Sequence, residues 1–227
     1  MLFPELAARL ADVRGRIGEA VARGGHSQRV TVVAVTKTLG PEAVRAAYEC
    51  DIQDVGENRV QEALDKIARV DVPVRWHLIG HLQRNKVKAL DRFTLLHSLD
   101  SMRLGEAVSE FGRARGRAVE VLVQVNVVGE ESKGGFAPGD LPAAAEQLAD
   151  LPGMRVTGVM TMAPLEAEER VLRRAFSGAR GARELLERAG HPARELSMGM
   201  SGDYEIAVEE GATMVRLGTV LFGARSA

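Results

Sequence analysis

Strand-like and helix-like segments alternate along almost the whole chain of 227 residues. The first strand-like segment, residues 30–36, reads Val-Thr-Val-Val-Ala-Val-Thr, and such a β-branched run is typical of a strand buried on both faces of a parallel sheet. The predicted strands are residues 30–36, 52–55, 75–79, 94–97, 119–125, 155–160, 195–197 and 214–216. The predicted helices between them include residues 41–50, 59–68, 82–90, 101–115, 140–150, 166–189 and 202–210. This alternation favours a parallel sheet covered by helices.

The number of repeats narrows the fold class. Eight βα units within about 200 residues match a compact (β/α)8 TIM barrel. An extra amphipathic helix over residues 5–23 precedes them. A doubly wound sheet is the alternative, but no Gly-x-Gly-x-x-Gly motif follows the first strand, where a dinucleotide-binding fold needs one. Because no linker rich in Pro, Gly or Ser divides the sequence, residues 1–227 are predicted to form a single domain.

The charge balance and the cysteine content limit the function classes. Thirty basic and thirty-one acidic residues give a net charge of −1, which gives no reason to expect nucleic acid or an anionic membrane as a partner. Cys50 is the single cysteine, so no internal disulfide can form, and a buried, inert thiol is expected. We expect no signal peptide and no membrane span, so the cytoplasm is the predicted compartment.

Lys37 follows the first predicted strand and is a candidate site residue. In a barrel, functional side chains gather at the C-terminal ends of the strands. A lysine amine in that region can be desolvated and can form a Schiff base with a carbonyl compound. The alternative is a lysine that ends a strand and reaches water. Polar residues at the ends of the other predicted strands favour a lined pocket over this alternative.

Two segments rich in small residues follow the last two predicted strands. They are Gly199-Met200-Ser201-Gly202-Asp203 and Gly218-Thr219. Exposed backbone N–H groups at a helix start, with a hydroxyl nearby, bind phosphate, and barrels commonly hold phosphate in these two loops. The alternative is two tight turns that need glycine. Together with Lys37, the loops suggest a phosphorylated carbonyl compound held at both ends.

Other site chemistries are disfavoured. His77 and His81 are four residues apart, but the segment is predicted as strand and loop and contains no His-Glu-x-x-His motif, so no metal site is expected. Asp203 stands where a Gly-x-Ser-x-Gly nucleophile elbow around Ser201 needs its second glycine, which disfavours a serine hydrolase.

Five ordered segments carry a resemblance to a known family. They are Val35-Thr36-Lys37, Gly56-Glu57-Asn58-Arg59-Val60-Gln61-Glu62, Trp76-His77-Leu78-Ile79-Gly80-His81-Leu82-Gln83-Arg84-Asn85-Lys86, Leu196-Ser197-Met198-Gly199-Met200-Ser201-Gly202-Asp203 and Val215-Arg216-Leu217-Gly218-Thr219-Val220-Leu221-Phe222-Gly223. On these segments the chain resembles the YggS/PROSC pyridoxal phosphate homeostasis proteins, whose fold is similar to the barrel domain of alanine racemase. One departure is Gly135, where a serine is expected; it touches none of the implied contacts.

The resemblance implies a cofactor and a set of residues that hold it. It implies that Lys37 forms an internal aldimine with pyridoxal 5′-phosphate (PLP). The implied phosphate-binding residues are Met200, Ser201, Gly218 and Thr219. Arg216 is implied to face the pyridine nitrogen and Asn58 to lie near the ring's other polar substituents. Because an arginine stays protonated, it should keep that nitrogen unprotonated and make the ring a poor electron sink.

Two functional hypotheses follow, a carrier of PLP and an amino-acid racemase. A two-base racemase needs a second acid/base group on the ring face opposite the lysine. In alanine racemase that group is a tyrosine from an additional β domain and the partner subunit. We expect no such domain after the eighth βα unit, and both tyrosines, Tyr48 and Tyr204, lie in predicted helices or at their starts. The carrier is therefore preferred, with no catalytic residue, PLP-dependent apo-enzymes as possible recipients, and a monomeric state.

Overall fold

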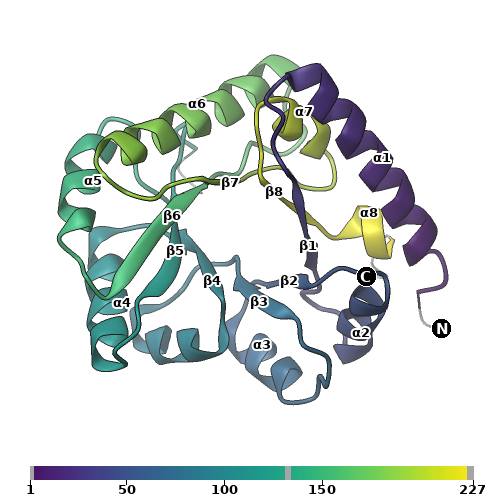
Figure 1. Cartoon of the computed structure of the whole chain (residues 1–227), viewed down its shortest axis with the longest axis horizontal. Coiled ribbons are helices and arrows are strands. Elements are labelled where there is room, and N and C mark those ends of the chain that lie inside the picture. The colour runs from purple at the N-terminus through teal and green to yellow at the C-terminus, as the bar shows by residue number, and fades with distance from the viewer. Residues whose placement is uncertain (1–2, 131–133, 224–227) are drawn as a thin grey trace.

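A closed barrel of eight parallel strands forms the centre of the molecule (Figure 1). The structure, a computed structural model, describes residues 3–130 and 134–223. The strands are β1 (Thr31–Val35), β2 (Asp54–Glu57), β3 (Arg75–Leu78), β4 (Leu95–Leu99), β5 (Val119–Gln124), β6 (Met154–Met160), β7 (Glu195–Ser197) and β8 (Met214–Leu217). Each strand pairs with the next one in sequence, and β8 pairs with β1 from Thr31↔Met214 to Ala34↔Leu217. The predicted (β/α)8 barrel is therefore confirmed.

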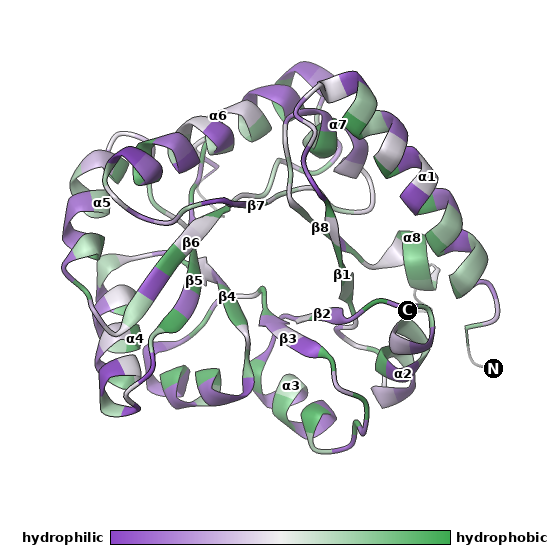
Figure 2. Ribbon diagram, in the orientation of Figure 1, coloured by the Kyte–Doolittle hydropathy of each residue, from purple (hydrophilic) through white to green (hydrophobic). Residues whose placement is uncertain are grey.

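Helices surround the barrel and include the predicted helix before the first strand. They are α1 (Leu6–Gly24), α2 (Pro41–Glu49), α3 (Val60–Ile67), η1 (Arg84–Arg92), α4 (Met102–Ala114), α5 (Leu141–Ala149), α6 (Glu169–Arg188), α7 (Tyr204–Glu209) and α8 (Thr219–Phe222). The extra helix α1 packs against α7 and α8, beside the point where β8 meets β1 (Figure 1). Hydrophilic and hydrophobic residues alternate along α1 and α6 (Figure 2), as expected for helices with one face toward the core.

Apolar side chains separate into two clusters. The large one lies between the strands and the helices and includes Leu10, Val55 and Phe176. The small one consists of Leu95, Leu122 and Met160, with Met162 and Met214 packed against it. Successive residues of a strand point to opposite faces, so His97, Gln124 and Arg216 lie on the same faces as Leu95, Leu122 and Met214. The barrel interior thus has an apolar layer and, beyond it toward the C-terminal ends of the strands, polar residues.

The structure differs from the predicted elements in two places. Residues 82–90 were expected to form an α-helix, whereas Arg84–Arg92 is a 3₁₀ helix. Its buried residues, Val87 and Leu90, are three apart, and the three-residue repeat of a 3₁₀ helix places both toward the core. The second strand lies two residues later than predicted and ends at Glu57. The Glu57 side chain is buried among polar partners that lie elsewhere in the sequence, so its place in the strand could not be predicted.

The side chains at the N-terminal ends of α3, α4 and α7 do not cap these helices, and the expected burial of Cys50 needs correction. Arg59 is the N-cap residue of α3. Ser101 and Asp203 occupy the N-cap positions of α4 and α7, but neither side chain caps its helix. The Cys50 thiol is free and only partly buried. Within residues 3–130 and 134–223, no helix has the length and apolar character that crossing a membrane requires.

Candidate functional site

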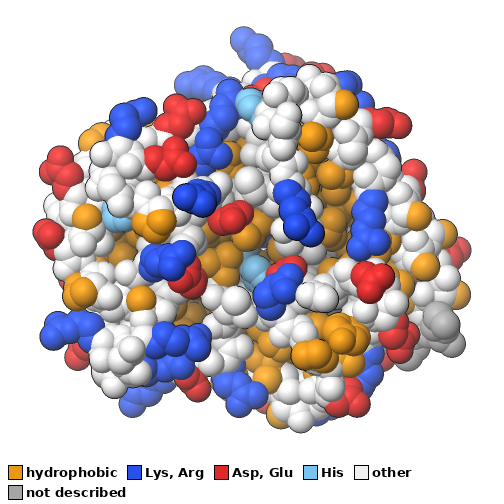
Figure 3. Space-filling model, viewed as in Figure 1, with side chains coloured by type: hydrophobic (Ala, Val, Ile, Leu, Met, Phe, Trp, Pro, Cys, Tyr) orange, Lys and Arg blue, Asp and Glu red, His pale blue; other side chains and the backbone are white. Residues whose placement is uncertain are grey.

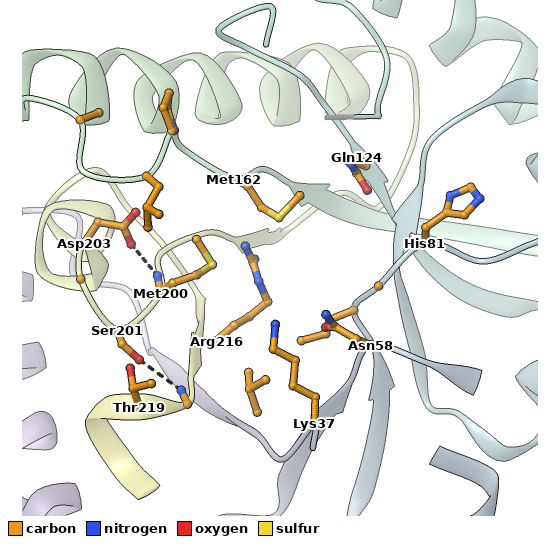
Figure 4. Close-up of a pocket in the computed structure, with 18 of the residues that line it drawn as sticks. Lys37, Asn58, His81, Gln124, Met162, Met200, Ser201, Asp203, Arg216 and Thr219 are labelled. Atoms are coloured by element: carbon orange, nitrogen blue, oxygen red, sulfur yellow. Dashed lines mark hydrogen bonds between the residues drawn. The ribbon is translucent and has the colours of Figure 1, made fainter. Parts of the chain in front are cut away.

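A cavity of about 1030 Å³ lies at the C-terminal ends of the strands. Segments that follow strands from all around the barrel contribute to its wall, and charged side chains of both signs lie over the barrel centre (Figure 3). The residues predicted from the sequence all line this cavity: Lys37, Asn58, Met200, Ser201, Arg216, Gly218 and Thr219. Figure 4 shows the Lys37 and Arg216 side chains in the same part of the cavity, with Asn58 beside Lys37 and with Ser201 and Thr219 near α8.

Lys37 lies in the turn after β1, not in the strand itself. The strand ends at Val35, and Thr38 adopts a φ of 65°, which is a strained conformation for a β-branched residue. The turn directs the Lys37 side chain into the cavity (Figure 4). Strain of this kind persists only where surrounding contacts hold the backbone, and the turn has such contacts on both sides of Lys37.

A buried ion pair holds the two neighbours of Lys37. The Lys66 ammonium, on α3, donates to the Thr36 carbonyl at 2.8 Å and to Glu57 Oε1 at 2.6 Å. Glu57 Oε1 also accepts a hydrogen bond from the Thr36 hydroxyl at 2.6 Å, and Glu62 accepts from the Thr38 N–H and from Lys66. The Lys66 and Glu57 side chains are 4% and 0% exposed. Lys66 and its two carboxylate partners therefore fix the backbone from which Lys37 extends.

The Glu57 carboxylate is the most constrained group of this cluster. Burial raises its pKa, against the opposing effect of its hydrogen bonds from Lys66 and Thr36. Its second oxygen, Oε2, is buried and has no hydrogen-bond partner. The charged form of Glu57 therefore depends on Lys66.

Ser201 joins the two loops of small residues. Its hydroxyl oxygen accepts hydrogen bonds from the backbone N–H groups of Gly218 at 3.2 Å and Val220 at 3.3 Å. The Asp203 side chain turns back and accepts from the Met200 N–H at 2.6 Å (Figure 4). Gly199 has a φ of 90°, and a Cβ there would lie 2.7 Å from the Ala207 Cβ, so this turn requires glycine. The result is a cradle of hydroxyl and N–H groups on one side of the cavity.

Arg216 is a buried cation at the inner wall of the cavity. Its Nη1 donates to the Ser197 carbonyl and to the Ser197 hydroxyl oxygen, each at 2.7 Å, and its Nη2 donates to the Thr161 carbonyl at 2.9 Å. Burial lowers its pKa from 12.5 to about 10, with an opposing contribution from Asp203. Arg216 therefore remains protonated near neutral pH and presents a fixed positive charge.

A line of buried polar groups continues from Ser197 through the barrel. His97 Nδ1 is 2.8 Å from Ser197 Oγ, His97 Nε2 is 2.8 Å from His77 Nδ1, and His77 Nε2 is 2.9 Å from Asp54 Oδ1. Arg75 makes a bidentate pair with Asp54, through Nε at 2.7 Å and Nη2 at 2.6 Å. Nothing in the sequence indicates this line, because it depends on how four strands are placed around the barrel.

The side of the cavity away from α8 carries neutral and paired groups. A Cβ on Gly80 would lie 2.2 Å from the Asn58 carbonyl oxygen, so the chain segments after β2 and β3 approach closely only because residue 80 is glycine. His81 Nδ1 is 2.8 Å from Asp100 Oδ2, and Gln124 donates to the Gly134 carbonyl at 2.6 Å. Within the described ranges no group of three or more His, Cys, Asp and Glu residues is placed to hold a metal ion.

Comparison with known proteins decides the family. A family model described as "Alanine racemase, N-terminal domain" matches residues 16–226. A pyridoxal phosphate homeostasis protein of Pseudomonas aeruginosa is 44% identical over 97% of this chain and 96% of its own length. The protein of the same name from Aquifex aeolicus is 42% identical over 96% of this chain and 97% of its own length. The chain belongs to the pyridoxal phosphate homeostasis protein family.

Solved structures agree with this family assignment. PipY of Synechococcus elongatus, in a structure with PLP bound, is 37% identical, with a TM-score of 0.85 over 96% of this chain and 100% of PipY. Alanine racemase of Corynebacterium glutamicum matches 94% of this chain and 62% of its own with a TM-score of 0.73 at 15% identity, which shows a shared fold. Gly135, where the resemblance led us to expect a serine, has a φ of 125°, and a Cβ there would lie 2.9 Å from the Gln124 carbonyl oxygen. Glycine is therefore the residue that suits this backbone.

Proposed function

We propose that this protein binds PLP in the cavity and serves PLP homeostasis by storing, buffering or delivering it. The observation that carries the proposal is one cavity that combines the Lys37 amine, the buried Arg216 cation and the cradle at Ser201. These are the three kinds of group that an aldehyde, a pyridine nitrogen and a phosphate require. The family name of its relatives and the PLP-bound structure of PipY support the same function.

Each polar part of PLP has a matching group in the cavity. When bound, PLP supplies an aldehyde that condenses with an amine, with loss of water, to give a Schiff base. We propose Lys37 as that amine. Ser201, Thr219 and the backbone of Met200 and Gly218 are proposed to hold the phosphate, where N–H and hydroxyl groups already converge.

The ring of PLP would meet the remaining two proposed residues. Arg216 is proposed to face the pyridine nitrogen, and Asn58, beside Lys37 in Figure 4, to face the other ring substituents. A guanidinium that stays protonated keeps the pyridine nitrogen unprotonated, which weakens the ring as an electron sink. This arrangement suits holding PLP better than stabilising a carbanion.

The racemase alternative lacks its tyrosine base. Neither tyrosine, both within the described part of the chain, lines the cavity. Tyr204 is buried, with the Arg16 guanidinium of α1 at 5.6 Å from its ring centre, and its hydroxyl has no hydrogen-bond partner. This placement, on the outer side of the barrel between α1 and α7, gives Tyr204 no route to the cavity. It supports a protein that holds PLP without robust turnover.

An absorbance spectrum tests the proposal. Purified protein mixed with PLP should become yellow and show the visible band of a Schiff base, and Lys37→Ala should lose the band. Lys86→Ala, an exposed lysine on η1, is the matched control and should keep it. Absence of the band in the wild type would refute PLP binding through a Schiff base.

A second experiment tests the carrier hypothesis against the racemase hypothesis. The protein is incubated with a panel of L-amino acids, and the products are examined by chiral analysis. Turnover of about 1 per second or more would contradict the carrier hypothesis.

The proposal has finer parts. We propose that PLP-dependent apo-enzymes receive the cofactor, that residues 1–227 act as a single domain, and that the protein works as a monomer in the cytoplasm. Sedimentation at micromolar concentration should give the mass of one chain, and a stable dimer would contradict the monomer. Mixing the PLP-loaded protein with an apo-enzyme should restore that enzyme's activity faster than PLP released into buffer does.

A further inference from the structure

The positive charge of Arg216 is buried, and its side-chain hydrogen bonds go to neutral groups. These groups are the carbonyls of Ser197 and Thr161 and the Ser197 hydroxyl. No salt bridge from Arg216 to a carboxylate is formed within the described part of the chain, although Asp203 lies near enough to raise its pKa. A buried cation without an anionic partner is costly, so the surroundings must stabilise it by oriented dipoles.

The line from Ser197 to Asp54 can supply those dipoles. Each hydrogen bond in the line is short. Arg216 lies 2.7 Å from Ser197 Oγ, Ser197 Oγ lies 2.8 Å from His97, His97 lies 2.8 Å from His77, and His77 lies 2.9 Å from Asp54. His97 is fully buried and His77 is 3% exposed. The four groups come from β7, β4, β3 and β2, so the line crosses the inside of the barrel.

The protons of this line can be assigned from its two ends. Arg216 can only donate, so the Ser197 oxygen accepts from it and its hydroxyl hydrogen is available for His97 Nδ1. At the far end the pKa of Asp54 is about 2, because hydrogen bonds from His77 and Arg75 outweigh the opposing effect of burial. Asp54 is therefore a carboxylate, which can only accept, and His77 Nε2 must carry a proton.

Both histidines then take one form. Burial, together with the positive charge of Arg216, holds the pKa of His97 well below its usual range, so His97 is neutral. Directing the Ser197 hydrogen toward His97 Nδ1 puts the His97 proton on Nε2, which then donates to His77 Nδ1. All donors point from Arg216 toward Asp54, and no proton is left without an acceptor.

We propose that Ser197, His97, His77 and Asp54 are positioning residues for Arg216. Their one-directional hydrogen-bond relay holds the guanidinium toward the cavity and connects its charge to the Asp54 carboxylate. This inference rests on the proposed function in one respect, namely that Arg216 meets the ring of PLP. The relay itself belongs to the protein alone and can be measured without any cofactor.

The first test is ¹⁵N NMR of the histidine side chains in cofactor-free protein. With five histidines in the chain, the signals of His77 and His97 can be assigned by single substitutions. In both rings the relay places the hydrogen on Nε2 and leaves Nδ1 as the acceptor. In Ser197→Ala, which removes the donor to His97 Nδ1, the His97 signals should shift. Nδ1 protonation of either histidine, or signals averaged between tautomers, would overturn the relay.

The second test is the affinity for PLP, with a matched control. Ser197→Ala removes one charge-assisted hydrogen bond to Arg216 and should weaken binding about tenfold. Thr157→Val also removes a buried hydroxyl from a strand, but that hydroxyl donates to the Val121 carbonyl outside the relay, so its affinity should stay within about twofold of the wild type. Equal affinities for the two variants would overturn the positioning role even if the tautomers are as assigned.

A double-substitution cycle separates the relay from simple loss of packing. If Ser197 and His97 act as one unit, Ser197→Ala combined with His97→Phe should bind PLP about as weakly as either variant alone. Effects on affinity that multiply would contradict the relay. A wild type that binds no PLP refutes the proposed function, and the NMR result on cofactor-free protein then decides the relay separately.

Discussion

Lys66→Met tests the physical account of the turn that carries Lys37. The substitution keeps the apolar stem of Lys66 and removes the ammonium, which donates to Glu57 at 2.6 Å and to the Thr36 carbonyl at 2.8 Å. The Glu57 carboxylate, fully buried and already without a partner at Oε2, would be left as an uncompensated charge. Breaking a buried pair by removing one partner costs about 3–5 kcal/mol. For a chain of this length, each kcal/mol lowers the melting temperature by about 2–4 °C.

Urea unfolding followed by circular dichroism measures this loss. Lys66→Met should lower the free energy of unfolding by about 3–5 kcal/mol, whereas the double variant with Glu57→Gln should lose less, because no buried charge remains. Arg155→Met, which breaks the exposed pair with Glu120 at 3.5 Å, is the control and should change the stability little. A loss below about 1 kcal/mol for Lys66→Met would refute the reasoning, because a loss of that size is typical of a solvent-exposed ion pair.

Two further predictions follow from Asp54 and Gly80. Because the pKa of Asp54 falls from 3.8 to about 2 in the folded state, its contribution to stability is complete above about pH 4 and is lost as the pH falls toward 2. Asp54→Asn should flatten the dependence of the unfolding free energy on pH in that window. An unchanged slope would contradict the lowered pKa of Asp54. Gly80→Ala places a Cβ 2.2 Å from the Asn58 carbonyl oxygen and should cost about 1–3 kcal/mol and weaken PLP binding. Gly139→Ala lies outside the cavity wall and places a Cβ where nothing lies within 4 Å, so it should change neither stability nor binding. Equal effects of the two substitutions would argue against the close approach at Gly80.

The sequence predicts the barrel well because the alternation of strand-like and helix-like segments is repeated eight times. Buried parallel strands are continuous β-branched runs, and the helices between them are long enough to show their own period. That the candidate residues line one cavity is predictable for a related reason, since the C-terminal ends of all eight strands meet at one face. Lys37 and Arg216 are far apart in sequence, yet β1 and β8 are neighbours in the closed barrel.

The polar contacts that support the site were not predictable. Lys66 has the pattern of a solvated helix residue, with Glu62 four positions before it, and only the packing of α3 against β2 buries it against Glu57. His97 and Ser197 are 100 residues apart, and their hydrogen bond depends on the register of strands on different sides of the barrel. Periodicity reports which face of a strand is buried, but it does not report which buried polar groups meet.

Reductive trapping tests the central claim most directly. The wild-type protein is mixed with PLP, treated with borohydride to fix any Schiff base as a stable amine, digested and analysed by mass spectrometry. The account predicts one labelled site, Lys37, and no label at that site in a sample from which PLP was removed before the borohydride was added. A label confined to Lys66, Lys86 or Lys88, or no label at all, would contradict it.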